Sequence, residues 1–111
     1  MRAVASAGLD PRRADGFLVA VNEIVTNALT HGVPPAVVNV FPTRTAIQVR
    51  VHDRGGSFTN RAAPVQQVPL ELHGRGLWIA SQLTDELRVD SGADGTTVTA
   101  TVRLRTPPVP I

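Results

Sequence analysis

Residues 10–35 read DPRRADGFLVAVNEIVTNALTHGVPP, and this stretch decides the fold. Asp10 before Pro11 is typical of a helix start, because Asp accepts backbone N–H groups at the N-cap and proline fits the first helical position. Gly32 and the two prolines that follow it end the helical pattern. Between these limits, one helical face is formed by the apolar residues Phe17, Val21, Ile24 and Ala28. The pattern predicts a long helix that ends at His31.

Strand patterns follow this helix. Residues 36–41 are rich in Val, and residues 45–53 alternate between apolar and polar side chains. Residues 87–91 and 96–105 are expected to form a closing hairpin. The apolar face of residues 45–53 consists of Ile47, Val49 and Val51.

The remaining segments complete a single-domain organisation. A second helix is predicted from Gly76 to about residue 87, and residues 2–9 could form a short additional helix. Residues 57–73 are predicted to form an irregular loop that is long enough to act as a lid. Residues 1–105 are expected to form one domain, with residues 106–111 as a loose tail. Helices and strands in this order predict an α+β fold, a two-layer sandwich.

Two missing residue types exclude several kinds of site. The chain of 111 residues contains no Cys, which excludes thiol nucleophiles and Cys-ligated zinc. All 11 basic residues are Arg. Without Lys, neither a P-loop nor the nucleotide site of a eukaryotic-type protein kinase can form. A nucleotide site in this chain must therefore have another design.

Charge and hydropathy favour a cytoplasmic protein that contacts neither nucleic acid nor membrane directly. The net charge is only +2, and the Arg residues are scattered among 9 carboxylates instead of forming a basic block. No apolar run approaches the ~18 residues of a membrane span. The N-terminus also lacks the pattern of a signal peptide.

A second column of residues runs along the long helix. Gly16, Ala20, Glu23 and Asn27 recur at helical spacing, so Glu23 and Asn27 lie one turn apart and can reach one ligand. The side-chain oxygen of Asn27 suits a hard cation such as Mg²⁺. Glu23 could polarise a water or a substrate hydroxyl. A solvated polar face explains the same column and, for the column alone, is the commoner explanation.

Asp53 ends the second strand on the face that carries Val51. A carboxylate on a core-facing position is costly unless it is hydrogen-bonded. Because Gly55 allows close backbone approach, Asp53 suits recognition of a donor such as the amino group of adenine. An Asp that caps a turn at a strand end is an equally good explanation.

Glycines near the second helix and the last strand provide two weaker signals. Gly74-Arg75-Gly76-Leu77 is expected to lead into the second helix, where exposed backbone N–H groups bind anions. Arg75 could pair with phosphate or point to solvent. Thr96, after Gly95, shares the inward parity of Val98 and has no obvious protein partner, so its hydroxyl could bind a ligand or a water. The β-propensity of Thr explains the position almost as well.

Together and in this order, these residues resemble the motifs of the GHKL ATPase superfamily over residues 14–104. Residues 21–32, VNEIVTNALTHG, resemble the N-box of the form E-x-x-x-N-A-x-x-H-G. Asp53-Arg54-Gly55 looks like the D-x-G adenine box. Gly74-Arg75-Gly76-Leu77 resembles the G-x-G-L phosphate loop, and Gly95-Thr96 the final G-T.

The resemblance implies a Bergerat-type ATP-binding fold, in which helices cover one face of a mainly antiparallel sheet. It implies Glu23 as the catalytic base, Asn27 as the ligand of Mg²⁺ and Asp53 as the selector of adenine. The loop over residues 74–77 would then contact the phosphates of ATP, with Gly55 and Thr96 in the same pocket.

Within the superfamily, GLWI at residues 76–79 and LTDEL at 83–87 look most like the anti-sigma-factor serine kinases of bacteria. This resemblance implies a serine/threonine kinase that phosphorylates an anti-sigma-factor antagonist and controls a sigma factor; a homodimer is compatible with it. The family places a strand and a fuller helix before the long helix, whereas nine residues precede Asp10 here. Two alternatives stay open: a non-catalytic nucleotide-gated binding module, and the detached ATPase domain of a larger sensor kinase.

Overall fold

The computed structural model describes residues 10–55, 61–64 and 70–104 of the chain. The short helix predicted over residues 2–9 and the tail predicted over 106–111 lie outside the described residues. In chain order the elements are α2 (Pro11–His31), β1 (Val37–Pro42), β2 (Ala46–Asp53), β3 (Arg61–Pro64), α3 (Leu70–Gln82), β4 (Glu86–Gly92) and β5 (Gly95–Arg103).

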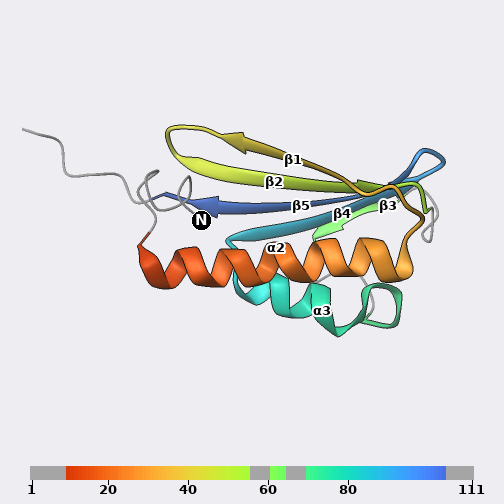
Figure 1. Cartoon of the computed structure of the whole chain (residues 1–111), viewed down its shortest axis with the longest axis horizontal. Helices are drawn as coiled ribbons and strands as arrows, with labels where there is room; N and C mark the ends of the chain where they lie inside the picture. Colours follow the sequence, from red (N-terminus) through yellow and green to blue (C-terminus); the bar gives the residue numbers. More distant parts are fainter. Residues whose placement is uncertain (1–9, 56–60, 65–69, 105–111) are drawn as a thin grey trace, which may run out of the picture.

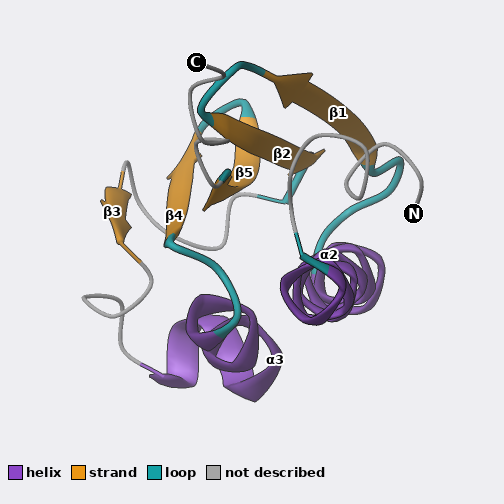
Figure 2. Cartoon of the chain, turned by 90° about the vertical axis from the view of Figure 1, so that its left-hand side faces the viewer, coloured by secondary structure: helices purple, strands orange, loops and turns teal. Residues whose placement is uncertain are grey.

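The strands form one five-stranded antiparallel sheet in the order β1-β2-β5-β4-β3 (Figure 1). The central pair, β2 and β5, runs in register from Ala46 opposite Arg103 to Asp53 opposite Thr96. Both helices lie on the same side of the sheet (Figure 2). The predicted two-layer α+β sandwich, with helices on one face of an antiparallel sheet, is confirmed.

Strand alternation and the apolar face of α2 build the core between the two layers. The predicted inward positions of β2 are buried, and the residues between them are half-buried or exposed. Phe17 and Ile24 of α2 are at most 1% exposed. Complete burial of each such side chain contributes roughly 1.5–3 kcal/mol. From β4 and β5 the core receives Leu87, Val89, Val98, Ala100 and Val102.

The long helix begins and ends where the sequence predicts. Asp10 is its N-cap, and the side chain accepts a hydrogen bond from the backbone N–H of Arg13 at 2.9 Å. The guanidinium of Arg13 donates to the carbonyl of Arg103 at 2.9 Å and pairs with Asp85 at 2.7 Å. These contacts join the first turn of α2 to the end of β5.

Two predictions for the segment between β2 and β4 are wrong. A strand, β3, lies within the stretch expected to be an irregular loop, and it pairs with the edge of β4. Its Pro64 is tolerated because an edge strand does not need every backbone N–H. In addition, α3 begins at Leu70 rather than Gly76, because Leu and Glu residues before the glycines favour helix. The same helix ends at Gln82, and Leu87 belongs to β4.

Neither of the two described helices combines the length and the apolar character that crossing a membrane requires.

Candidate functional site

Asp53 lies buried at the end of β2, with 6% of its surface exposed. Its Oδ1 accepts hydrogen bonds from the backbone N–H of Gly55 at 2.7 Å and of Val33 at 3.1 Å. Among the described residues these are the hydrogen bonds of the carboxylate, so Oδ2 keeps its capacity to accept from a ligand. The side chain is thus held by two backbone donors from different parts of the chain. This satisfies the requirement that a buried carboxylate be hydrogen-bonded.

Three glycines leave room for Asp53. A Cβ on Gly32 would overlap the carboxyl group, and one on Gly55 would lie 2.9 Å from Oδ1. A Cβ on Gly95 would overlap the Asp53 carbonyl, and Gly95 has a φ of 117°, which side-chain-bearing residues rarely adopt. Gly32 directly follows α2, Gly55 follows β2 and Gly95 begins β5, so a side chain at any of the three positions would crowd Asp53.

Thr96, near the start of β5, contacts the segment that follows Asp53. Its Oγ1 donates to the carbonyl of Gly55 at 2.5 Å and shares a hydrogen bond of 2.9 Å with the hydroxyl of Ser91. The prediction that Thr96 lacks a protein partner is therefore wrong, because the backbone after β2 folds over the hairpin. We call Gly32, Val33, Asp53, Gly55 and Thr96 the Asp53 corner.

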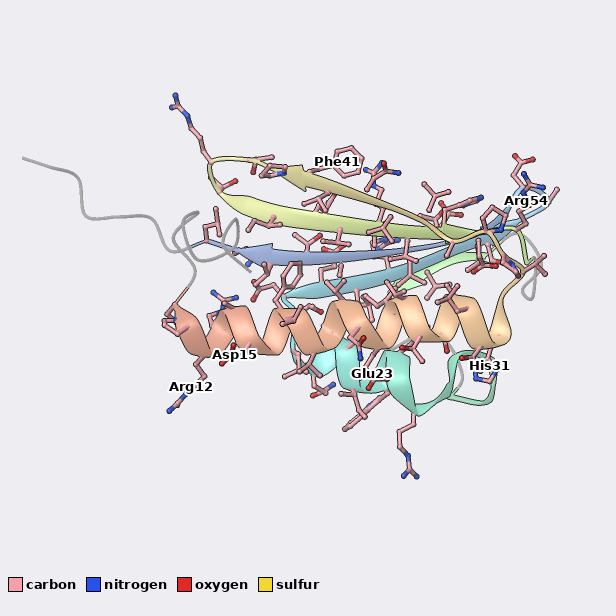
Figure 3. All side chains as sticks on the ribbon, viewed as in Figure 1. Arg12, Asp15, Glu23, His31, Phe41 and Arg54 are labelled. Atoms are coloured by element: carbon pink, nitrogen blue, oxygen red, sulfur yellow. The ribbon has the colours of Figure 1, made fainter. Side chains whose placement is uncertain are left out.

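The second column of α2 faces α3. Glu23 points from α2 toward α3 (Figure 3). A Cβ placed on Gly76 would lie 2.7 Å from Oε2 of Glu23, and one on Gly16 would lie 3.5 Å from Leu83, which directly follows α3. Ala20 is fully buried, and Glu23 and Asn27 are half-buried. The column is thus a helix–helix interface, and the solvated-face explanation is wrong. Glu23 and Asn27 share the face that borders α3.

The glycine motif of α3 differs most from the prediction. Gly74, Arg75, Gly76 and Leu77 lie inside the helix rather than at its start. Only the first four N–H groups of a helix are free, so the N–H groups of Gly74–Leu77 belong to the intrahelical series. Arg75 is exposed, whereas Leu77 is 1% exposed and belongs to the core. The expected anion-binding turn at Gly74–Gly76 is absent from this helical conformation.

α2 connects the two groups of residues. Gly32, which follows the helix directly, packs against Asp53, and Glu23 packs against Gly76. With a rise of 1.5 Å per residue, Asn27 and Glu23 lie about 8 and 14 Å before Gly32 along the helix axis. The structure therefore places the predicted acid and amide along α2, and the predicted adenine-selecting residue, Asp53 of β2, against the end of that helix.

Sequence reasoning missed four contributions to the Asp53 corner. Gly32 was expected to end the helix through its backbone freedom, but its φ of −89° is available to any residue, and its role is to leave space for Asp53. The Val33 N–H, the Ser91 hydroxyl and the φ of Gly95 also went unpredicted. The glycines at 32 and 95 were the available signal, but their contact with Asp53 depends on the folded arrangement.

The fold and the site define a two-layer α/β domain in which an acid and an amide on the long helix lie near a buried strand-end aspartate. A family model described as the histidine kinase-like ATPase domain matches residues 1–102, and the chain belongs to this family. The match supports the GHKL superfamily and, with it, ATP binding. A search of curated proteins finds no significant match.

Proposed function

We propose that the chain is a Mg-ATP-binding regulatory serine/threonine kinase of the anti-sigma-factor type. It would act in the cytoplasm, phosphorylate an anti-sigma-factor antagonist and thereby control a sigma factor. The observation that carries this proposal is that α2 contacts both regions. Glu23 in the middle of α2 lies against Gly76 of α3, and Gly32 at the end of α2 lies against Asp53. A ligand with a base at one end and phosphates at the other can span these two regions.

Asp53 is the residue that would select adenine. Two backbone N–H groups fix Oδ1, so Oδ2 can accept a hydrogen bond from the amino group of the base. Hydrogen bonds to charged groups contribute roughly 1.5–3 kcal/mol. Guanine presents an acceptor at the corresponding position, so the carboxylate would disfavour GTP.

The residues on α2 fit a magnesium ion and its phosphates. Asn27 offers a neutral oxygen donor at a half-buried position one turn from Glu23, and Mg²⁺ usually takes only one or two protein ligands. When bound, the ion supplies positive charge that offsets the charge of the phosphates. The exposed guanidinium of Arg75 would add a second positive group on the α3 side.

Glu23 is the candidate general base. Its carboxylate is half-buried between α2 and α3 and lies against Gly76. A carboxylate there can accept the proton of a serine or threonine hydroxyl as that oxygen attacks the terminal phosphate. The proton then resides on Glu23 and the phosphoryl group on the hydroxyl, with ADP as the leaving group.

Calorimetry with ATP, ADP and GTP, with and without Mg²⁺, tests the nucleotide assignment. Asp53→Asn should keep the two bonds to Oδ1 and therefore the fold, but it replaces Oδ2 by a donor. We expect ATP affinity to fall roughly 10- to 100-fold, as one charge-assisted hydrogen bond implies. Asp90→Asn, at an exposed position of β4, is the control. Equal affinity of the parent chain for ATP and GTP would show that Asp53 does not select adenine over guanine.

Phosphate transfer tests the kinase assignment separately. The chain is incubated with γ-labelled ATP, Mg²⁺ and purified anti-sigma-factor antagonists. Glu23→Ala should retain ATP binding but lose at least about 100-fold in transfer rate, the usual contribution of a general base. The control is Asp15→Ala, because Asp15 is exposed near the start of the same helix (Figure 3). Unchanged transfer in Glu23→Ala would exclude Glu23 as the base.

One observation favours a second function, a nucleotide-gated binding module without catalysis. Gly74–Gly76 lie within a helix that closes on Glu23, so the glycine N–H groups are not presented as an anion site. Stoichiometric antagonist binding that depends on ATP, with no labelled phosphate on the antagonist, would support the binding module over the kinase.

A further inference from the structure

A row of buried polar side chains crosses the sheet where β2 ends. The strand registers place Thr96 of β5 between Asp53 of β2 and Ser91 of β4. Thr96, Asp53 and Ser91 are 9%, 6% and 2% exposed, respectively. The next row on the same face is apolar and consists of Val51, Val98 and Val89. Because buried polar groups are costly without hydrogen bonds, each member of the polar row needs a partner.

The hydroxyl groups of this row form a hydrogen-bond chain with a fixed direction. Thr96 Oγ1 donates to the carbonyl of Gly55 at 2.5 Å, and a threonine hydroxyl has only one proton. The Ser91 hydroxyl, 2.9 Å from Thr96 Oγ1, is therefore the donor of the bond between these two residues. The N–H of Gly55 donates in turn to Oδ1 of Asp53 at 2.7 Å. The chain thus runs from Ser91 through Thr96 and Gly55 to the carboxylate of Asp53.

Ser91 lies too far from Asp53 to act on it directly. β5 separates β4 from β2, so the two residues stand about 10 Å apart across the sheet. Gly55 is the link, because its carbonyl accepts from Thr96 while its N–H donates to Asp53. Fixing the carbonyl of Gly55 helps to hold its N–H against Oδ1. Hydrogen bonds in such a chain also polarise one another, so a loss at one end weakens the bond at the other.

We propose that Ser91 is a positioning residue for base recognition. Through Thr96 and Gly55 it keeps Oδ1 of Asp53 occupied, and so it leaves Oδ2 as the acceptor for the amino group of a purine. This role rests on the proposed function of Asp53 as the selector of adenine. Ser91 itself lies outside the four motifs that carry the resemblance, at residues 21–32, 53–55, 74–77 and 95–96.

The first test compares ATP with purine riboside triphosphate, which lacks the amino group, by calorimetry on the full chain. The parent should prefer ATP roughly 10- to 100-fold, as one hydrogen bond to a charged group implies. Ser91→Ala should reduce this preference about three- to tenfold, the effect of losing one buried hydrogen-bond partner. The loss should fall on ATP, with the affinity for the analogue unchanged. A merely structural role of Ser91 would weaken both nucleotides alike and leave the preference as it is in the parent.

Three further variants control this comparison. Ser91→Thr keeps the hydroxyl and should keep the preference for ATP. Ser91→Cys keeps a small side chain with a weaker donor and should give an intermediate preference, so the test does not depend on the alanine variant alone. Thr97→Val is the matched control, because it removes the hydroxyl that bonds to Nδ1 of His52 at 2.8 Å from the neighbouring position of β5. It should bind both nucleotides as the parent does.

The second test determines whether Ser91 acts through Thr96. Thr96→Val interrupts the chain between Ser91 and Gly55. In that background, Ser91→Ala should change the preference for ATP by less than about twofold, because residues that act in one network are not additive.

The results distinguish a failure of Asp53 from a failure of Ser91. A parent chain that binds ATP and the analogue equally would overturn the proposed roles of both residues. A parent that prefers ATP, with the full preference retained in Ser91→Ala, would overturn the role of Ser91 alone. So would an effect of Ser91→Ala that is equally large in the Thr96→Val background and in the parent.

Discussion

The Asp53 corner and the Gly74–Gly76 segment of α3 form opposite ends of the proposed nucleotide site, and they are built in opposite ways. The corner is held by hydrogen bonds among the end of α2, the end of β2 and the β4–β5 hairpin. The α3 segment places two glycines inside a helix, where each is less favourable than Ala by roughly 0.5–1 kcal/mol. The proposed base-binding end is therefore fixed by hydrogen bonds, whereas the proposed phosphate-binding end lies in a helix that its two glycines make less stable.

The largest effect is expected from Gly95→Ala. Gly95 has a φ of 117°, and a Cβ there would overlap the backbone carbonyl of Asp53. We expect a loss of about 3 kcal/mol or more in the free energy of unfolding, since strained backbone and steric overlap add together. Urea denaturation followed by circular dichroism measures this change. Asp94→Ala, in the same turn and exposed, should stay within about 0.5 kcal/mol of the parent. If the free energy of unfolding of Gly95→Ala equals that of the parent, the Asp53 corner is not rigid.

A smaller loss is expected from Thr96→Val. The substitution keeps the shape of the side chain but removes the hydrogen bond to the Gly55 carbonyl and the one shared with Ser91. We expect the free energy of unfolding to fall by about 1–2 kcal/mol, the usual effect of losing a buried hydrogen-bond partner. Thr96→Ser keeps the hydroxyl and should recover most of this loss in the same denaturation experiment. If Val and Ser are equally stable at this position, the hydrogen bonds do not hold the corner.

The smallest effect, with the opposite sign, is expected from Gly76→Ala. Alanine favours the helix by roughly 0.5–1 kcal/mol, so the chain should become more stable by that amount, with Glu23 moving aside. If ATP requires this segment to leave the helix, the same free energy should lower ATP affinity about two- to fivefold. Calorimetry and denaturation measure the two changes.

Gly16→Ala is the matched control for that prediction. It lies in α2, and its added Cβ would make an ordinary contact of 3.5 Å with Leu83. It should raise stability similarly without changing ATP affinity. Equal ATP affinities for Gly76→Ala and the parent would indicate that ATP does not unwind α3.

The elements with strong local patterns were predictable from the sequence. The start of α2 was predicted from Asp10 and Pro11, and its extent from the apolar spacing. Strand alternation predicted that Asp53 lies on the buried face. β3 was missed because four residues ending in proline carry a weak strand signal and pair only with an edge. The start of α3 was missed because a glycine motif suits a loop as well as a helix.

The contacts within the site were harder to predict for a different reason. The fit of Gly32 and Gly95 around Asp53 joins residues that are far apart in the chain, so it depends on the register of β2 with β5. Likewise, the position of Glu23 against Gly76 follows from the packing of α2 on α3. The motif order indicated which residues belong together, but only the fold shows how they are held.

The bond between Arg13 and the Arg103 carbonyl has a practical consequence for handling the protein. It joins the start of α2 to the end of β5. Arg12 and Asp15 lie at this end of the molecule, whereas His31 and Arg54 lie at the other end (Figure 3). Asp10 and Leu104, where the described part of the chain begins and ends, therefore lie at the end of the molecule opposite His31 and Arg54. A label attached beside Asp10 or Leu104 is therefore expected to leave the Asp53 corner, at the opposite end of α2, accessible to a ligand.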